Sequence, residues 1–356
     1  MSAQRTVNYS DIDRILLVRT DRIGDVLLST PVAAAIKAVK PEMHVALLAR
    51  NQTKIIGERN PSIDNVLTID NPDGSKRPFT DITSLIRKEK YDCAVVLHPT
   101  LYLAVLLVFA RVPLRAGTAY RFYSPLFNLR HPEHRKVSLK HEVEYNLGLL
   151  APLNIPCSEP EFQFDIYDDD REGADQVLRE INIEANDRFC VLQPGTGGSS
   201  MTWPPHFFAE TGILLKEQFN IEPVVHWGPG EEDRARKVCD TGGGSVRMLP
   251  RVLTLSELAA LLQKALFILG PDTGVLHLAN SVGTRMICLY PPSWYMSSRR
   301  WGPYGIPESM IISDAPESSV RNLTEEAREK IMQRITPQMV VEAAGKIKII
   351  DKMDNL

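Results

Sequence analysis

The residues with the most suggestive chemistry are an aspartate and a histidine within residues 265–279, A-L-F-I-L-G-P-D-T-G-V-L-H-L-A. The apolar start has the length of a buried strand, a Gly-Pro pair ends it, and Asp272 and Thr273 are residue types that cap helices. This pattern predicts a strand, a tight turn and a helix that starts with Val275 and Leu276, at the carboxyl ends of the strands, where parallel sheets bind ligands. Free N–H groups at a helix start suit phosphate, whereas Asp272 suits sugar hydroxyls and His277 can face the same ligand. The alternative is a plain helix cap beside a half-buried histidine.

A second carboxylate, Asp25, lies within residues 19–31, R-T-D-R-I-G-D-V-L-L-S-T-P, just after a predicted strand. It follows a glycine turn and begins a helix at the carboxyl end of a strand, a position that a plain helix cap would also explain. Because the start of a helix lowers the pKa of a carboxylate, we expect a low pKa for Asp25. Asp21 is a second carboxylate, four residues away.

Two further loops also follow predicted strands. The Gly/Ser loop P-G-T-G-G-S-S, residues 194–200, can offer backbone N–H groups and hydroxyls to an anion, although it could equally be a flexible loop. In H-W-G-P-G-E-E, residues 226–232, the Glu231 carboxylate can favour the first turn of a helix. The candidate anion-binding residues of the first loop are Thr196, Gly197, Ser199, Ser200 and Thr202.

These segments sit in a regular alternation of predicted strands and helices, which indicates an α/β fold with parallel sheets. A segment rich in proline and acidic residues near the middle predicts two domains, residues 1–160 and 161–356. The longest apolar run, Leu101 to Ala110, is too short to span a bilayer and predicts a buried helix. The stretch Arg111 to Lys140 predicts a long basic loop with interleaved aromatic residues.

Composition and charge narrow the class of protein. The chain of 356 residues is 44% hydrophobic and carries a net charge of −3, typical of a globular protein, and nothing indicates nucleic acid binding. Residues 1–150 hold 21 basic and 15 acidic residues, a net of +6 that suits an anionic partner or merely a solvated surface. Five scattered cysteines and a polar start predict a cytoplasmic protein with reduced thiols, without a signal peptide or a metal cluster.

Several of these segments resemble one family. The stretch G-P-D-T-G-V-L-H-L-A is similar to the D-T-G-x-x-H-x-A signature of the lipopolysaccharide heptosyltransferases, glycosyltransferase family 9. The segments at residues 19–31, 193–204, 226–232, 255–265 and 299–305 are similar to other parts of that family. The resemblance therefore spans most of the chain.

The resemblance implies a GT-B fold, with two Rossmann-like doubly wound domains facing a central cleft and a last helix that crosses back to the first domain. It implies an inverting, metal-independent transfer of heptose from a nucleoside-diphosphate heptose, with ADP as the expected nucleotide, to a lipopolysaccharide core or a related surface glycan, without a cofactor. Asp25 would be the base, relying on alignment as much as on basicity, with Asp21 as the alternative. Residues 196–202, Glu231, Asp272–Gly274 and His277 would bind the donor. The first domain would bind an anionic glycolipid or oligosaccharide acceptor through Arg22, Arg115 and Arg121, in peripheral contact with the inner face of the membrane.

One position departs from the family. The family places a lysine two residues before Trp-Pro, where it contacts the diphosphate, and this chain has Met201 there. Arg299 or Arg300 are the candidates to supply the missing charge. The departure keeps two alternatives open: a transferase with another donor sugar or with a glycan or protein acceptor, and a sugar-nucleotide-binding protein that does not catalyse.

Overall fold

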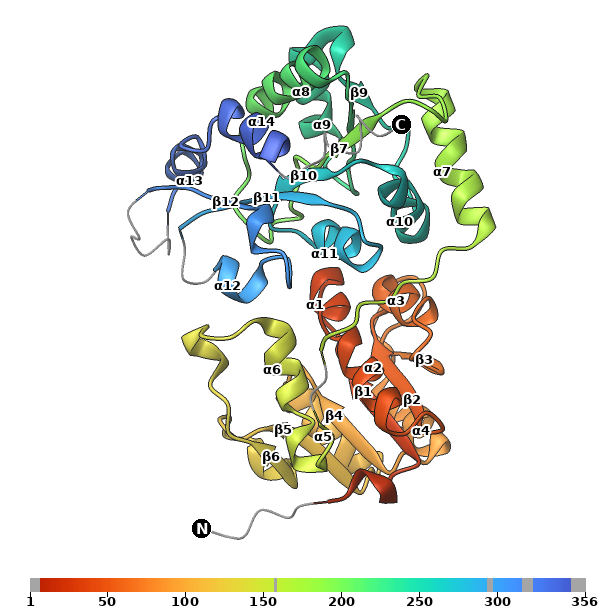
Figure 1. Cartoon of the computed structure of the whole chain (residues 1–356). Coiled ribbons are helices and arrows are strands. Elements are labelled where there is room, and N and C mark those ends of the chain that lie inside the picture. Colours follow the sequence, from red (N-terminus) through yellow and green to blue (C-terminus); the bar gives the residue numbers. More distant parts are fainter. Residues whose placement is uncertain (1–6, 157–158, 293–296, 316–322, 347–356) are drawn as a thin grey trace. The chain divides into compact units, whose positions relative to one another are not determined.

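The computed structural model describes residues 7–156, 159–292, 297–315 and 323–346. The chain divides into two compact units, Met1–Asp165 and Ile166–Leu356 (Figure 1). The division falls five residues beyond the boundary expected from the sequence. The separate roles of the two units and the return of the chain's end to the first unit stay predictions.

The first unit is built on a six-stranded parallel sheet with the strand order β3-β2-β1-β4-β5-β6. Strand order reverses between β1 and β4, and an open parallel sheet binds its ligands at the carboxyl ends of the strands beside such a switch point. The loops that follow β1 and β4 therefore define the expected site of this unit. The strands are β1 Arg14–Val18, β2 His44–Ala49, β3 Asn65–Thr68, β4 Cys93–Val96, β5 Leu114–Thr118 and β6 Leu129–His131.

Alternate residues of the central strands face α4 and α5, and together they form a hydrophobic core that includes Leu16, Ala46 and Ala94. The helix α2 contacts α6 elsewhere in the unit. The α6 helix begins with a capping box, in which the His141 side chain accepts from the Val143 N–H and Glu144 accepts from the His141 N–H. The helices are α1 Ile23–Leu27, α2 Thr30–Val39, α3 Lys54–Glu58, α4 Phe79–Glu89, α5 Leu101–Phe109 and α6 Glu142–Gly148.

The second unit repeats this topology with the strand order β12-β11-β10-β7-β8-β9, again all parallel. Its switch point lies between β7 and β10, so the loops after these two strands lie next to one another. The strands are β7 Phe189–Leu192, β8 Glu222–Val225, β9 Arg247–Met248, β10 Ile268–Pro271, β11 Met286–Tyr290 and β12 Met310–Ile312.

One core of the second unit joins the sheet to α8, α9, α13 and α14, with Trp203 fully buried and its indole N–H bonded to the Ile335 carbonyl. The last described helix, α14, packs against α8. The helices are α7 Asp168–Glu180, α8 Pro205–Phe219, α9 Glu232–Gly242, α10 Leu255–Lys264, α11 Gly274–Ser281, α12 Ser298–Trp301, α13 Glu325–Met332 and α14 Pro337–Lys346.

Three local expectations were wrong. The helix expected to begin at Asp25 begins at Ile23 and is short, and a second helix, α2, follows it with Pro31 in the first turn, where the missing N–H costs nothing. The basic stretch is not one long loop, because it contains β5 and β6. Within β5, Gly117 lies against the Phe127 ring, and a Cβ added at Gly117 would come within 2.7 Å of a ring carbon. The α5 helix is not buried on all sides, since Leu101, Tyr102, Val108 and Phe109 are exposed.

None of the helices in the described part of the chain is long and apolar enough to cross a membrane. The four described cysteines, Cys93, Cys190, Cys239 and Cys288, are free thiols, as the sequence predicts, and Cys157 lies outside the described residues.

Candidate active site

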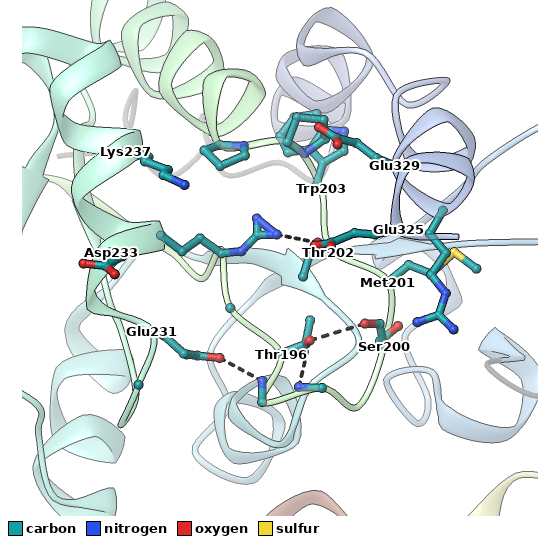
Figure 2. Close-up of a pocket in the computed structure, with 18 of the residues that line it drawn as sticks. Thr196, Ser200, Met201, Thr202, Trp203, Glu231, Asp233, Lys237, Glu325 and Glu329 are labelled. Carbon is teal, nitrogen blue, oxygen red and sulfur yellow. Dashed lines mark hydrogen bonds between the residues drawn. The ribbon is translucent and has the colours of Figure 1, made fainter. Parts of the chain in front are cut away.

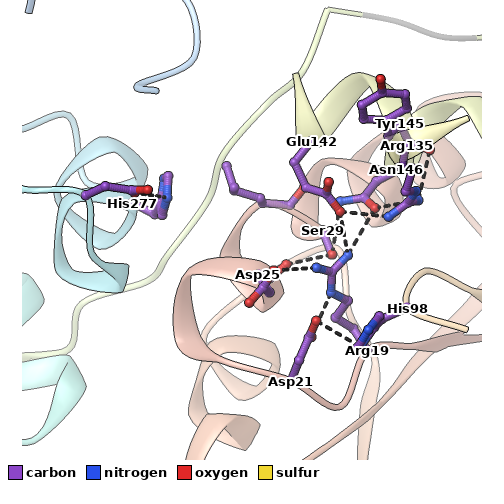
Figure 3. Close-up of polar contacts among 12 residues, drawn as sticks. Arg19, Asp21, Asp25, Ser29, His98, Arg135, Glu142, Tyr145, Asn146 and His277 are labelled. Atoms are coloured by element: carbon purple, nitrogen blue, oxygen red, sulfur yellow. Dashed lines mark hydrogen bonds and ion pairs between the residues drawn. The ribbon is translucent and has the colours of Figure 1, made fainter. Parts of the chain in front are cut away.

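The loop after β1 gathers three carboxylates around one buried guanidinium, that of Arg19 (Figure 3). Arg19 donates from Nε to Asp21 Oδ1 at 2.7 Å and from Nη2 to Asp25 Oδ1 at 2.6 Å. Across the switch point, His98 in the loop after β4 places Nδ1 3.1 Å from Asp21 Oδ2. Asp25 is therefore held through one oxygen, beyond the carboxyl end of β1, where a parallel sheet binds its ligands.

Asp25 is not the helix cap that the sequence allowed as an alternative. The α1 helix begins at Ile23 and its N-cap is Arg22, so Asp25 lies at the third helical position and Gly24 lies inside the helix. The Asp25 side chain is 20% exposed. A cap role therefore does not explain this carboxylate.

The third carboxylate, Glu142 at the start of α6, joins this loop to the basic stretch. Its Oε1 accepts from Arg19 Nη1 at 3.0 Å and from Arg135 Nη1 at 2.7 Å, with the side chain only 1% exposed. Asn146, one turn further along α6, accepts from both guanidinium groups and donates to the Leu28 carbonyl and the Ser29 hydroxyl. The cluster is thus a continuous buried network that fixes the orientation of Arg19.

The pKa of Asp25 differs from the sequence expectation. Burial raises the pKa of Asp25 above its ordinary value of 3.8, and the pull of Arg19 only partly offsets this, while Asp21 and Glu142 push it further up. The lowering expected from the helix start was wrong, because loss of solvation outweighs the partial charge of one short helical turn. Burial opposes ionisation of Arg19, but the attraction of Glu142, Asp21 and Asp25 raises its pKa overall. Arg19 therefore stays charged.

In the second unit, the Gly/Ser loop after β7 is held by Glu231 (Figure 2). The Glu231 carboxylate accepts from the Gly197 N–H at 2.8 Å and from the Gly228 N–H at 3.1 Å. It lies against Gly195, where an added Cβ would come within 2.1 Å of the carboxylate carbon and would displace the Glu231 carboxylate. The Gly198 N–H is bonded to the Thr196 hydroxyl. The loop is therefore already shaped by internal bonds, and a bound anion would compete with Glu231 for the Gly197 N–H.

A buried polar pair supports the base of this loop. His226, after β8, approaches Gln193 Oε1 through Nδ1 at 2.5 Å, and burial lowers the pKa of His226 to about 4, so the imidazole is neutral at physiological pH. Gln193 donates from Nε2 to the Gly195 carbonyl at 3.0 Å. The Gly/Ser loop therefore has a rigid base in the core.

The turn after β10 and the start of α11 bring Asp272 and His277 close together. Asp272 Oδ1 lies 3.8 Å from His277 Nε2, and both side chains are largely buried. Thr273 is the N-cap of α11, which begins at Gly274, and its side chain makes no capping bond. Ser199 Oγ lies within hydrogen-bond distance of the Thr196 and Asp272 carbonyls, at 2.7 and 3.2 Å. The predicted donor-binding residues of the loops after β7 and β10 are thus directly connected.

The Met201 side chain packs in the core, although Met201 is also among the residues that line a neighbouring pocket. Its side chain is 2% exposed and belongs to the core with Trp203. Beside it is a pocket of about 950 Å³ lined by the Gly/Ser loop and by three cations, Arg234, Lys237 and Arg328, together with the acids Glu231, Asp233, Glu325 and Glu329 (Figure 2). Arg234 donates from Nη2 to the Thr202 hydroxyl at 2.5 Å.

The arginines expected to replace the family lysine lie elsewhere. Arg299 and Arg300 are in α12, and neither lines this pocket. The Arg300 guanidinium instead lies 4.6 Å from the centre of the Trp301 ring. The cations beside the Gly/Ser loop are therefore those of α9 and α13.

The three arginines expected to bind an acceptor differ in availability. Arg22 and Arg121 are exposed. The Arg115 guanidinium is half-buried and donates to the Leu126 carbonyl at 2.9 Å and to the Val112 carbonyl at 2.6 Å, and burial lowers its pKa. Arg115 therefore braces β5, whereas the other two present their charge to solvent.

No group of histidine, cysteine or acidic side chains that could hold a metal occurs among the described residues. The sequence profile of glycosyltransferase family 9 (heptosyltransferase) matches residues 80–332. The chain belongs to glycosyltransferase family 9.

Individual proteins agree with this assignment. Lipopolysaccharide heptosyltransferase 3 of Escherichia coli K12 is 26% identical over 292 residues, which cover 78% of this chain and 82% of the relative. A family 9 glycosyl transferase of Veillonella parvula superposes with a TM-score of 0.81 at 20% identity, covering 97% of this chain and 99% of the other. The E. coli ADP-heptose lipopolysaccharide heptosyltransferase II superposes with a TM-score of 0.74 at 18% identity, covering 96% and 99%. The α/β architecture of the GT-B class and a glycosyltransferase activity, both expected from the sequence, are confirmed.

The sequence did not indicate several residues of the two candidate sites: Arg19 and Glu142 in the first unit, and Gln193, His226 and Arg234 in the second. Arg19 directly follows a buried strand and precedes two aspartates, a spacing that could have indicated a buried partner for them. The Glu142–Arg135 contact joins residues of two different elements, and no local sequence pattern predicts it.

Proposed function

We propose that this family 9 enzyme is an inverting heptosyltransferase that moves heptose from ADP-heptose to the lipopolysaccharide core or a related surface glycan. The observation that carries the proposal is the Asp25 carboxylate, held by Arg19 through Oδ1 at 2.6 Å and given a raised pKa by burial. A carboxylate of raised pKa is a stronger base than an ordinary aspartate, and the guanidinium fixes its direction. The name of the structurally similar E. coli enzyme supports ADP-heptose as the donor.

In the proposed reaction, the free oxygen of Asp25 takes the proton of the acceptor hydroxyl. The hydroxyl oxygen attacks the anomeric carbon from the face opposite the diphosphate, and the bond from that carbon to the phosphate oxygen breaks. ADP leaves with the electron pair, so the new glycosidic bond has the inverted configuration. Asp25 carries the proton, and Arg19 stays charged throughout.

The donor half of the proposal rests on the loops after β7, β8 and β10. Glu231 and Asp272 supply carboxylates for the ribose and sugar hydroxyls, while Thr196, Ser199, Ser200 and Thr202 surround the diphosphate with hydroxyl groups. Gly197, Thr273, Gly274 and His277 complete the donor set. Carboxylates accept hydrogen bonds from hydroxyl groups and repel phosphate. Glu231 and Asp272 would therefore bind the ribose and the sugar, and the diphosphate would lie away from both.

Charge on the departing diphosphate needs a cation, since stabilisation of developing charge lowers the barrier. With Met201 buried, we assign this role to the pocket of α9 and α13, and to Arg234 first, because it already contacts Thr202 at 2.5 Å. Burial lowers the pKa of Arg234, and the nearby Glu325, Glu329 and Glu231 only partly offset this. A bound anion would raise that pKa and so stabilise the charged guanidinium.

The acceptor would be an anionic glycolipid or oligosaccharide that meets the first unit through Arg22, Arg121 and Arg115, at the cytoplasmic face of the membrane. We propose catalysis without a metal or a cofactor. A second candidate, a protein that binds a nucleotide sugar without transferring it, is favoured only by Met201.

A panel of nucleotides tests the donor assignment. Binding of ADP and ADP-heptose should raise the melting temperature of the purified protein more than UDP, GDP or their sugars at equal concentration. Release of ADP from ADP-heptose in the presence of EDTA would then separate an enzyme from a binding protein. A shift with UDP or GDP sugars alone would contradict the proposed donor.

A further inference from the structure

An apolar stripe lies on the outside of α5 in the first unit. Helix α5 reads L-Y-L-A-V-L-L-V-F and has no charged residue. Leu101, Tyr102, Val108 and Phe109 are each more than a third exposed, with Phe109 at 58%. Residues three, four and seven positions apart share one face of a helix, and the half-exposed Val105 falls between them. A soluble helix normally keeps its solvent face polar, so this stripe indicates a partner.

Neighbouring aromatic residues extend the stripe into one surface. The Phe79 ring makes edge contacts with Tyr102 and Phe109, with ring centres 5.8 and 5.6 Å apart. Near the start of α5, Tyr123 donates its hydroxyl to the Pro99 carbonyl and makes an edge contact with Phe122, whose ring is 83% exposed. We name the side chains of Leu101, Tyr102, Val105, Val108, Phe109 and Phe122 the α5 surface.

Cations stand at both ends of the α5 surface. Arg87 donates to the Phe109 carbonyl at 2.5 Å, and the exposed Arg111 follows two residues after this helix end. Arg121 adjoins Phe122 at the other end and is exposed. Apolar side chains surrounded by exposed cations are the pattern that binds a bilayer with anionic headgroups.

We propose that the α5 surface docks the protein on a bilayer that contains anionic phospholipids. The inference rests on the proposed function in one respect, that the acceptor is anchored in a membrane. A second copy of this chain fits less well, because a symmetric dimer brings the same patch face to face. The cations at the ends of the α5 surface would then lie opposite cations of the second copy.

Vesicle sedimentation tests the inference on the full-length protein. Wild type should pellet with vesicles of phosphatidylethanolamine and phosphatidylglycerol, bind phosphatidylcholine vesicles less, and be released by salt because salt screens exposed charges. Phe109→Ser/Phe122→Ser should weaken partitioning at least about tenfold, since both rings leave the lipid. Arg111→Ala should weaken binding to the anionic vesicles only.

A matched control is Ile312→Ser/Met339→Ser, which removes two exposed apolar side chains of the second unit, 47% and 40% exposed. It should bind vesicles as wild type does. The docking inference is overturned if wild type does not bind anionic vesicles, if the two double variants bind alike, or if sedimentation velocity shows a dimer that Phe109→Ser/Phe122→Ser dissociates.

ADP release in vesicle-free buffer keeps this test separate from the proposed function. Wild type and Phe109→Ser/Phe122→Ser should release ADP from ADP-heptose at equal rates. Release without vesicle binding defeats the docking inference alone. Vesicle binding without any ADP release defeats the proposed function alone.

Discussion

Replacement of Asp25 by asparagine should lower the activity of the protein without lowering its stability. The cluster holds two guanidinium groups, Arg19 and Arg135, and three carboxylates, Asp21, Asp25 and Glu142, so its net charge is 2 − 3 = −1 when all are ionised. Asp25→Asn brings this to zero and keeps an oxygen that can accept from Arg19 Nη2. We expect the rate constant kcat to fall roughly 10²–10⁴-fold because the base is lost. That corresponds to about 2.7–5.5 kcal/mol of barrier at 1.36 kcal/mol per tenfold.

The stability of the same variant should not fall. A carboxyl whose pKa is raised by folding stabilises the protein below its unfolded pKa, and this contribution is lost as the pH rises through its folded pKa. At neutral pH the ionised Asp25 therefore costs stability, and a neutral asparagine removes that cost. The melting temperature of Asp25→Asn should equal or exceed that of wild type at pH 7, by scanning calorimetry.

The pH profile gives an independent check. Activity of wild type should fall on the acid side as Asp25 takes up a proton, at a pH above the ordinary aspartate value of 3.8. The residual activity of Asp25→Asn should lack this decline. Asp21→Asn is the matched control, because it removes the same charge from Arg19 and should retain activity within about tenfold. Near-normal turnover in Asp25→Asn, or a larger loss in Asp21→Asn, would refute the assignment of the base.

Four further substitutions test the donor and acceptor sites. Asp272→Ala should weaken donor binding by about 1–3 kcal/mol, as expected for unpaired polar partners, and unchanged affinity by calorimetric titration would reduce Asp272 to a structural residue. Arg121→Ala should raise the acceptor KM more than the donor KM, with an effect that shrinks at high salt, whereas a change in the donor constant alone would remove Arg121 from the acceptor site. Met201→Lys should lower the melting temperature because it buries an ammonium group in the core. Arg234→Ala should lower turnover about tenfold or more because the diphosphate loses its cation. A Met201→Lys enzyme that is faster than wild type would mean that the diphosphate lacks a cation in wild type.

Most of the fold follows from local patterns in the sequence. Apolar runs such as Met286–Tyr290 have the length and content of buried strands, and that strand has those bounds in the structure. The segment Leu114–Thr118 was missed because L-R-A-G-T lacks the apolar run of a buried strand, and its pairing with β4 is decided by tertiary contacts. The α5 helix was expected to be buried because hydropathy alone does not tell which face of a helix is covered.

The chemistry was predicted less completely than the fold. The sequence singles out Asp25 and Asp272 because each follows a strand, which is a topological property. It does not reveal that Glu142 reaches Arg19, a contact between residues 123 positions apart. The side chain of Met201 turns into the core, and only packing against neighbours such as Trp203 determines that.

The configuration of the product tests the central claim most directly. Purified wild-type protein is incubated with ADP-heptose and a deacylated lipopolysaccharide core acceptor, and the new glycosidic bond is assigned by NMR. A base that activates the acceptor for a single displacement predicts one added heptose whose anomeric configuration is inverted relative to the donor, with one ADP released for each bond formed. Retention of configuration, or ADP-heptose left unconsumed while another nucleotide sugar is transferred, would contradict the account.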